Sequence, residues 1–292
     1  MKTNIKFIKQ SPLEMLFDPE QYSYLESKGK RFAYMRSGTG EPVLMVHGIT
    51  TYSFIWRKLI GFLDNDFDLI RLDLLGCGAS EMSVSFDLSL KNHAEEIIGF
   101  LDELGIEKVH LIGHDLGGGI SQILAVKYPS RIKSMILMNT VGYNYWPVQP
   151  IVAMRTPIIR QLAMDAFDVG YHRTIVKKAL YNDSAFTREL LDLFLVNFRD
   201  SLARKSFLHF ARCLDNNNLM EIAEQLKQVT MPVLILRAEK DVYLSSEISD
   251  KLNSDIPGSI FKVIPGSGHY MQEDAPAEIS EEIRMFINSV HG

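Results

Sequence analysis

Short apolar runs that alternate with helical patterns are the feature of this sequence that most restricts its fold. Strands made almost entirely of apolar residues are buried on both faces, which is typical of parallel sheets. Strands that alternate with helices indicate βαβ units with right-handed crossovers. We therefore predict an α/β protein with a mostly parallel central sheet flanked by helices. The predicted strands are an edge strand at Arg31–Arg36 and six apolar runs at Val43–His47, Asp68–Leu72, Lys108–Ile112, Lys133–Met138, Pro232–Leu236 and Ser259–Ile264.

Helical patterns account for the other segments of the chain. Apolar residues recur at helical spacing over 53–63, 90–104, 118–128 and about 277–290. From about residue 140 to residue 230 the helical patterns continue without a convincing strand, which is far longer than a normal connection. We therefore predict a core at 1–139 and 231–292 and a helical cap at 140–230. Open α/β sheets bind ligands at the carboxyl ends of their strands, so we expect the cap there. The simpler alternative is that this segment only extends the core.

The third apolar run leads into Gly113-His114-Asp115-Leu116-Gly117, and a helical pattern follows. This is the G-x-S-x-G nucleophile elbow with Asp in the place of Ser. A side chain on so sharp a turn between strand and helix has a strained backbone, and the residues two positions away must be small. The amino end of the following helix also favours an ionised carboxylate. Asp115 alone could equally be an ordinary helix N-cap, so the remaining parts of a site have to be identified independently.

Two further residues follow predicted strands at the same edge of the sheet. Asp241 comes after the fifth apolar run, and His269 lies in Pro265-Gly266-Ser267-Gly268-His269-Tyr270 after the sixth. Their order along the chain is nucleophile, acid and base, as the elbow architecture requires. We therefore predict Asp115, Asp241 and His269 as catalytic residues. The backbone N–H groups of Ile49 and Leu116 are predicted to form an oxyanion hole.

The elbow, the segments around Asp241 and His269, and the two segments that precede the elbow resemble the α/β-hydrolase family over nearly the whole chain. Asp at the elbow is similar to the branch that contains haloalkane dehalogenases, haloacetate dehalogenases and epoxide hydrolases, in which the nucleophile is a carboxylate. The resemblance implies the α/β-hydrolase fold with a helical lid inserted late in the sheet, and no cofactor or metal. The residues that carry it are SGTGEPVLMVHG (37–48), RLDLLGCGAS (71–80), LIGHDLGGGISQILAVKYPSRIKSMILMN (111–139), PVLILRAEKD (232–241) and PGSGHYMQEDAPAEI (265–279).

The chemistry implied by the resemblance has two steps. Asp115 attacks an electrophilic carbon and forms an alkyl ester, and His269, oriented by Asp241, activates the water that hydrolyses it. Haloalkane dehalogenases usually have Trp directly after the nucleophile and a second donor such as Asn after the His-Gly. Leu116 and Ile49 occupy these places. Haloacetate dehalogenases usually have Arg where Leu116 stands. We therefore expect a small apolar epoxide in preference to a halide.

Epoxide hydrolases of this family protonate the opening oxygen with lid tyrosines or a Tyr/His pair. Tyr171 and His172 lie roughly where the family places the first lid donor, so we rank them first. Each candidate could instead be a packing residue. The further candidates are Tyr143, Tyr145, Trp146 and His209.

Three other functions stay open at this point. The first is a haloalkane or haloacid dehalogenase. The second is a carboxylic ester or lactone hydrolase in which Asp115 acts through water as a general base. The third is a ligand sensor without catalysis, suggested by the missing substrate-specific donors.

Composition and charge exclude several broad classes of protein. The 292 residues are 46% hydrophobic with a net charge of −5, which is ordinary for a soluble globular protein and unfavourable for binding nucleic acid or anionic lipid. No apolar run reaches the ~18 residues of a membrane helix, and the first residues lack the apolar stretch of a signal peptide. Cys77 and Cys213 are then expected to be reduced thiols. We expect a cytoplasmic protein with a small-molecule substrate and no nucleic-acid or membrane partner, and the oligomeric state stays open.

Overall fold

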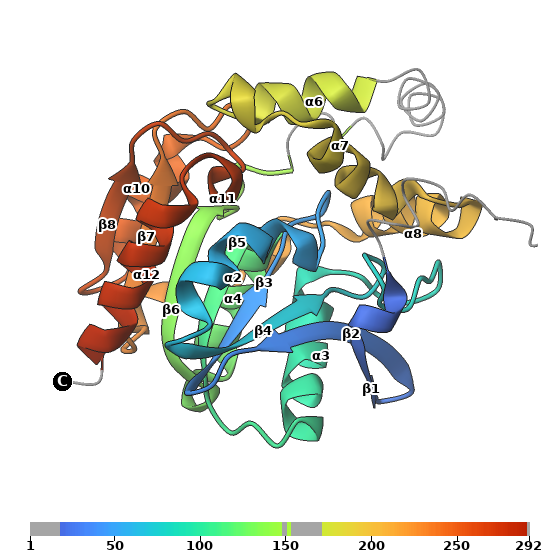
Figure 1. The fold of residues 1–292 in the computed structure, drawn as a ribbon. Coiled ribbons are helices and arrows are strands. Elements are labelled where there is room, and N and C mark those ends of the chain that lie inside the picture. The colour runs from blue at the N-terminus through green and yellow to red at the C-terminus, as the bar shows by residue number, and fades with distance from the viewer. Residues whose placement is uncertain (1–17, 148–150, 153–170, 291–292) are drawn as a thin grey trace, which may run out of the picture.

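In the computed structural model, which describes residues 18–147, 151–152 and 171–290, an eight-stranded sheet forms the centre of the molecule (Figure 1). The strand order is β1-β2-β4-β3-β5-β6-β7-β8. The pairs β1–β2 and β2–β4 are antiparallel, and the other five pairs are parallel. The prediction of a mostly parallel sheet is therefore confirmed. The strands are β1 (Ser23–Ser27), β2 (Lys30–Ser37), β3 (Glu41–Val46), β4 (Phe67–Asp73), β5 (Val109–Asp115), β6 (Ile132–Thr140), β7 (Val233–Ala238) and β8 (Ile260–Ile264).

The six predicted apolar runs correspond to β3 through β8. The strand predicted at Arg31–Arg36 is β2, but it lies inside the sheet, because β1 pairs with its outer edge. The sequence of β1, SYLES, is mostly exposed and buries only Ser27. It therefore carries no apolar pattern from which a strand could be predicted.

Helices cover both faces of the sheet, as the apolar strands require. α3 and α4 pack together on one face, which α10 also covers, and α2 and α12 pack together on the other (Figure 1). The described α-helices are α2 (Arg57–Leu63), α3 (Leu90–Glu103), α4 (Leu116–Lys127), α6 (Tyr171–Ala179), α7 (Arg188–Leu195), α8 (Ser201–Cys213), α9 (Asn217–Met220), α10 (Ser246–Asp255), α11 (Met271–Asp274) and α12 (Pro276–Val290). Short 3-10 helices lie at Pro19–Gln21, Ser53–Trp56, Pro129–Arg131, Asp183–Ala185, Val196–Phe198 and Gln225–Gln228.

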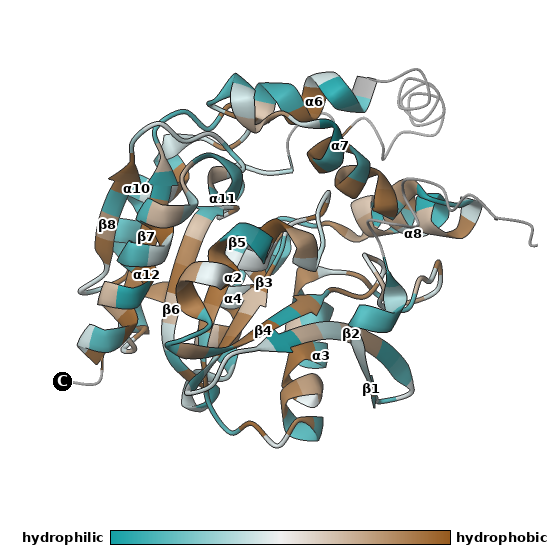
Figure 2. Ribbon diagram, in the orientation of Figure 1, coloured by the Kyte–Doolittle hydropathy of each residue, from teal (hydrophilic) through white to brown (hydrophobic). Residues whose placement is uncertain are grey.

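The hydrophobic core lies between these layers. β4 and β7 are buried at every residue, and the central strands are largely brown in Figure 2. Helix faces turned toward the sheet supply the remaining apolar side chains, such as Ile97 of α3 and Ile283 of α12, both fully buried. This core fixes where the strands end and therefore where the following loops can place polar side chains.

The helices α6, α7 and α8 lie across the carboxyl ends of the strands (Figure 1). The Asn197 amide donates to the Thr51 carbonyl at 3.0 Å and accepts from the Gly78 N–H at 2.8 Å. The Tyr270 N–H donates to the Ala179 carbonyl at 3.4 Å. Thr51, Gly78 and Tyr270 are in loops that follow β3, β4 and β8, so the helices contact the edge expected to bind ligand. The division into a core and a cap at 140–230 stays a prediction.

Among the residues that the structure describes, no helix is both long enough and apolar enough to cross a membrane.

Truncation of a central strand residue tests this description of the core. Leu111 of β5 is fully buried, whereas Val263 of β8 is 50% exposed. We expect Leu111→Ala to lower the free energy of unfolding by about 2–5 kcal/mol, because it leaves a cavity. The matched variant Val263→Ala should change it by about 0.5 kcal/mol or less. Urea unfolding measures both values, and equal losses in the two variants would contradict the assignment of β5 to the buried centre.

Candidate active site

Asp115 lies at a sharp turn between β5 and α4, as the elbow motif predicts. It is the last residue of β5, and α4 begins at the next residue. Its φ of 53° and ψ of −118° are strained for a residue with a side chain. A Cβ at Gly113 or Gly117 would collide with the backbone of Gly117 or Val46, respectively. The two glycines are therefore required for the turn that projects the Asp115 carboxylate from the sheet.

Two backbone N–H groups contact the Asp115 carboxylate. The Ile49 N–H donates to Oδ1 at 3.2 Å, and the Leu116 N–H is a second backbone donor. Gly48 keeps this approach open, because a Cβ there would collide with the Asp115 side chain. Burial raises the pKa of Asp115 above its usual range, while His269 and the two N–H groups act in the opposite direction without cancelling the rise. The pair of donors predicted as an oxyanion hole thus lies at the carboxylate itself.

His269 and Asp241 are paired. The His269 Nδ1 lies 3.0 Å from the Asp241 Oδ2, and the Asp241 Oδ1 accepts from the N–H groups of Tyr243 at 2.8 Å and Leu244 at 3.1 Å. Burial raises the pKa of Asp241, but His269 and these hydrogen bonds outweigh it and lower the pKa to about 2. Asp241 is therefore an anion that orients the imidazole and leaves Nε2 as the nitrogen that can take a proton.

The charge balance at His269 favours its cation. Burial lowers the pKa of His269, but Asp241 and then Asp115 raise it, and the net result lies above the usual 6.5. The charges of the three predicted residues therefore interact, because the carboxylates of Asp241 and Asp115 both act on the His269 imidazole. This arrangement can supply a nucleophile, a general base and a residue that orients the base.

Buried side chains that we did not predict hold the loop that carries His269. The Asn139 amide donates to the carbonyls of Gly268 and His269 at 3.1 and 2.9 Å and accepts from the Ala238 N–H at 2.9 Å. The His114 Nε2 lies 2.9 Å from the His269 carbonyl. Burial and then the nearby His269 lower the pKa of His114 to about 3, so its ring is neutral and donates from Nε2. No sequence pattern indicates which carbonyls these side chains would reach.

Asp274 connects the same loop to the helices above it. Its Oδ2 accepts from the N–H groups of Gly268 and Tyr181, both at 2.9 Å, and its Oδ1 accepts from the Asn182 N–H at 3.0 Å. A Cβ at Gly268 would collide with the Ala179 carbonyl. The end of α6 and the loop that carries His269 are therefore packed as one unit.

Two tyrosines beside the predicted residues were also missed. The Tyr243 ring centroid lies 5.3 Å from that of His269 at 88°, and its hydroxyl donates to the Ile175 carbonyl at 2.8 Å. Tyr270 directly follows His269, and its hydroxyl is hydrogen-bonded to the Thr50 hydroxyl at 2.9 Å. Adjacency to Asp241 and His269 was the only signal in the sequence that could have identified them.

The predicted donors between β6 and β7 are dispersed. The Tyr143 hydroxyl donates to the Asp255 carboxylate at 2.7 Å, so its proton is already engaged by α10. Tyr145 is 38% exposed. The His209 Nε2 lies 2.7 Å from the Phe86 carbonyl. For these three candidates the structure gives no support for a role as donor.

The proposed role of His172, Tyr171 and Trp146 as donors stays a prediction. His172 lies on α6 and is partly exposed, whereas the side chain of Tyr171 is outside the described residues. Trp146 is buried, and its indole N–H has no hydrogen-bond partner among the described residues. In the same part of the chain, no group of three or more His, Cys, Asp or Glu side chains could hold a metal ion.

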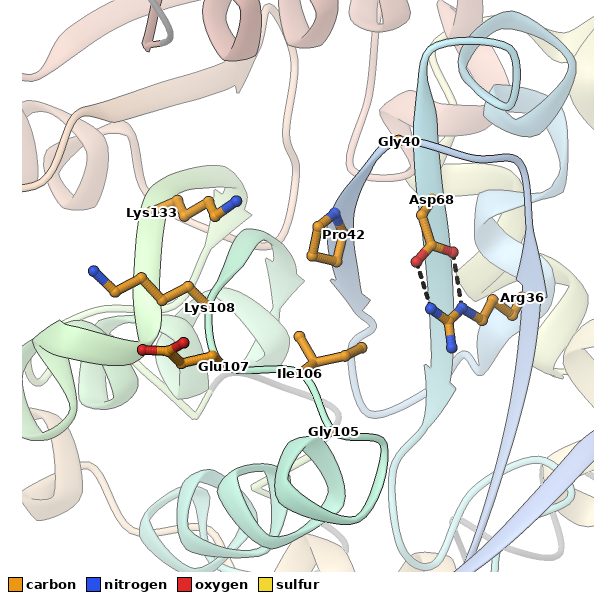
Figure 3. Close-up of a pocket in the computed structure, with 9 residues that line it drawn as sticks. All are labelled: Arg36, Gly40, Pro42, Asp68, Gly105, Ile106, Glu107, Lys108 and Lys133. Carbon is orange, nitrogen blue, oxygen red and sulfur yellow. Dashed lines mark hydrogen bonds and ion pairs between the residues drawn. The ribbon is translucent and has the colours of Figure 1, made fainter.

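A polar pocket of about 570 Å³ lies at the opposite edge of the sheet (Figure 3). Its Arg36 side chain donates to both Asp68 oxygens, at 2.8 and 2.6 Å, and its Lys133 is paired with Glu41. It is formed where β3, β4, β5 and β6 begin, away from Asp115. The lining residues are Arg36, Gly40, Pro42, Asp68, Gly105, Ile106, Glu107, Lys108 and Lys133.

Comparisons with known sequences agree with the fold. A family model described as alpha/beta hydrolase fold matches residues 41–163. The uncharacterized hydrolase YugF of Bacillus subtilis (strain 168) is 29% identical and covers 85% of this chain and 90% of its own. Haloalkane dehalogenase 2 of Mycobacterium tuberculosis (strain H37Rv) is 28% identical over 91% of this chain and 96% of its own. The cis-3-alkyl-4-alkyloxetan-2-one decarboxylase of Shewanella oneidensis is 27% identical over 92% of this chain and 89% of its own.

Solved structures share the fold. The epoxide hydrolase CorEH has a TM-score of 0.80 at 18% identity, and the match covers 92% of this chain and 99% of that one. A loop variant of the haloalkane dehalogenase DbeA from Bradyrhizobium elkanii also has a TM-score of 0.80, at 20% identity, with 92% and 97% covered. Identities this low establish the architecture alone.

Titration of the histidines tests the electrostatics of the site. Burial lowers the pKa of His47 to about 4 and those of His93 and His114 to about 3, so these rings should stay neutral above pH 5. We expect NMR to show His269 titrating above pH 6.5. Asp241→Asn removes the main charge that opposes burial, so the pKa of His269 should then fall.

The His269→Gln variant identifies the resonance that belongs to His269. An unchanged pKa of His269 in Asp241→Asn would contradict the pairing of the two side chains.

Proposed function

We propose that this chain, an α/β hydrolase by fold, uses Asp115 as a covalent nucleophile toward a small strained oxygen heterocycle, an epoxide in the first place. The observation that supports this most is a carboxylate at the elbow, contacted by two backbone N–H groups and electrostatically coupled to the His269–Asp241 pair. A hydroxyl nucleophile would need a base to activate it, whereas a carboxylate can attack saturated carbon directly.

The first step forms an ester on Asp115. A carboxylate oxygen attacks a ring carbon, the ring C–O bond breaks, and its electron pair stays on the leaving oxygen. Backbone donors from Ile49 and Leu116 hold the carboxylate in place for this attack. The product is a hydroxyalkyl ester of Asp115, once the leaving oxygen has gained a proton.

Hydrolysis of that ester is the second step. His269 takes a proton from water through Nε2, and the water oxygen attacks the carbonyl carbon of the Asp115 ester. The Ile49 and Leu116 N–H groups then stabilise the oxyanion. Asp241, with its pKa of about 2, stays charged and stabilises the imidazolium. The ester bond breaks, the His269 imidazolium gives its proton to the leaving oxygen to complete the diol, and Asp115 loses its proton to return to the carboxylate.

Two observations favour oxygen over halide as the leaving group. The side chains of Ile49 and Leu116 are apolar and buried, so neither donates a hydrogen bond to a halide. Haloalkane dehalogenases, which the chain resembles, usually have donors at these places. The second observation is the relative named for an oxetan-2-one, a strained four-membered lactone, which is 27% identical to this chain. Ring strain, rather than side-chain stabilisation of a halide, would then supply the driving force.

Haloalkane dehalogenation is the second candidate. It is favoured by the 28% identity to haloalkane dehalogenase 2 over 96% of that protein. The buried indole N–H of Trp146 would be a donor for the halide from outside the two usual places. The same nucleophile and base would serve this reaction, so the two candidates differ in leaving group rather than in mechanism.

Replacement of the base separates the two chemical steps. In His269→Gln, alkylation of Asp115 should proceed while hydrolysis stops, so incubation with epoxides should raise the intact mass by one substrate. Loss of a general base typically slows a step about 10²–10⁴-fold. The matched double variant Asp115→Ala/His269→Gln should gain no mass. Peptide mapping should locate the adduct on Asp115.

The same panel distinguishes the remaining functions. An adduct from haloalkanes with halide release, and none from epoxides, would identify a dehalogenase. Turnover of p-nitrophenyl esters without an adduct and without oxygen-18 in Asp115 would indicate a general-base esterase. A ligand released unchanged, with binding unaffected by Asp115→Ala, would indicate a sensor. Any of these three outcomes contradicts the proposal.

A further inference from the structure

The opening of an oxygen heterocycle requires a proton at the leaving oxygen. Asp115 cannot supply it, because Asp115 is the nucleophile in this step. Among the predicted donors, Tyr143 and His209 are hydrogen-bonded elsewhere. A donor that lies in the loops beside Asp115 and His269 would meet this requirement.

Tyr270 lies where these loops meet. Its hydroxyl is hydrogen-bonded to the Thr50 hydroxyl at 2.9 Å. Thr50 directly follows Ile49, whose N–H is 3.2 Å from the Asp115 Oδ1. Tyr270 itself directly follows His269. The phenol is therefore beside the base, and it is hydrogen-bonded to the loop whose Ile49 N–H contacts Asp115.

Packing fixes the Tyr270 ring in this place. Its centroid is 5.0 Å from that of His269 and 4.8 Å from that of Phe194 in α7. Its backbone N–H donates to the Ala179 carbonyl at 3.4 Å. The ring thus lies between the loop that carries His269 and the helices above the sheet.

We propose that the Tyr270 hydroxyl is the proton donor to the leaving oxygen, with Thr50 as its hydrogen-bonding partner. This inference rests on the proposed function and adds a catalytic residue to its first step. As the Asp115 oxygen bonds to carbon, the ring C–O bond breaks and the leaving oxygen takes the phenolic proton. The Thr50 hydroxyl then donates to the phenolate.

The proton balance closes over one turnover. Hydrolysis of the ester gives a protonated Asp115 and, through His269, the second hydroxyl of the diol. The proton on Asp115 then returns to the Tyr270 phenolate, so carboxylate, imidazole and phenol are restored. Burial raises the pKa of Tyr270 well above its usual 10, although the Thr50 hydrogen bond opposes the rise. The phenol therefore keeps its proton until the leaving oxygen develops negative charge, and the phenolate readily takes the proton back from Asp115.

The test uses Tyr270→Phe in the His269→Gln background. Phe keeps the ring contacts and removes only the hydroxyl. We expect adduct formation from styrene oxide, followed by intact mass in single turnover, to slow about 100-fold. A solvent deuterium isotope effect on this step should be present with Tyr270 and lost with Phe. A residue that only shapes the pocket would change the rate but not the isotope effect.

The matched control is Tyr143→Phe in the same background. It also removes a tyrosine hydroxyl and its hydrogen bond, here to Asp255, and it should leave the rate and the isotope effect unchanged. Thr50→Val is a second variant that tests the inference if Tyr270→Phe fails to fold. It should slow adduct formation about tenfold, the effect of one lost hydrogen bond.

Two outcomes would overturn the inference, and they have different consequences for the proposed function. If Tyr270→Phe, or Thr50→Val in its place, forms the adduct at the control rate with the same isotope effect, Tyr270 is not the donor and the proposed function stands. If His269→Gln with Tyr270 intact forms no adduct from any epoxide, the proposed function fails, and the inference fails with it.

Discussion

The strained turn at Asp115 is the constraint on which the rest of the site depends. A residue with a side chain adopts a φ of 53° and a ψ of −118° only when its surroundings leave no alternative. Here the carbonyl of Asp115 accepts from the Val141 N–H at 3.2 Å, the carboxylate accepts from the Ile49 N–H, and α4 begins immediately afterwards. Contacts from the residue after β6, from the loop after β3 and from α4 therefore all hold one residue, and the parallel sheet brings them together.

Two carboxylates in this site have opposite electrostatic environments. Asp241 accepts hydrogen bonds from two N–H groups and from His269, and its pKa falls to about 2. For Asp115 burial dominates, and its pKa rises. Environments that push the pKa values of two similar groups apart are what separates their chemical roles. The more basic carboxylate is the better nucleophile, and the less basic one is suited to hold a neighbouring cation.

The parts of this molecule that could be predicted from sequence are those determined locally. β3 through β8 are rich in apolar residues, and Asp115, Asp241 and His269 lie at or after the carboxyl ends of three of them, so topology alone puts them at one edge. β1 buries a single residue and gave no signal. Long-range partners were not predictable either. The bond from Tyr143 to Asp255 joins residues 112 positions apart, and an aromatic residue after His269 is indistinguishable in sequence from one that only packs.

Asp274 limits how freely this fold can exchange parts during evolution. Its carboxylate holds the N–H groups of Tyr181 and Asn182 beyond α6 together with that of Gly268. An inserted helical segment is often regarded as an interchangeable module that alters specificity and leaves the machinery below unchanged. In this protein a replacement segment would have to reproduce the backbone after α6, because otherwise Asp274 would lose two of the three N–H partners that join this segment to the loop of His269. Changes in the segment after α6 and in the loop that carries His269 are therefore coupled through one carboxylate.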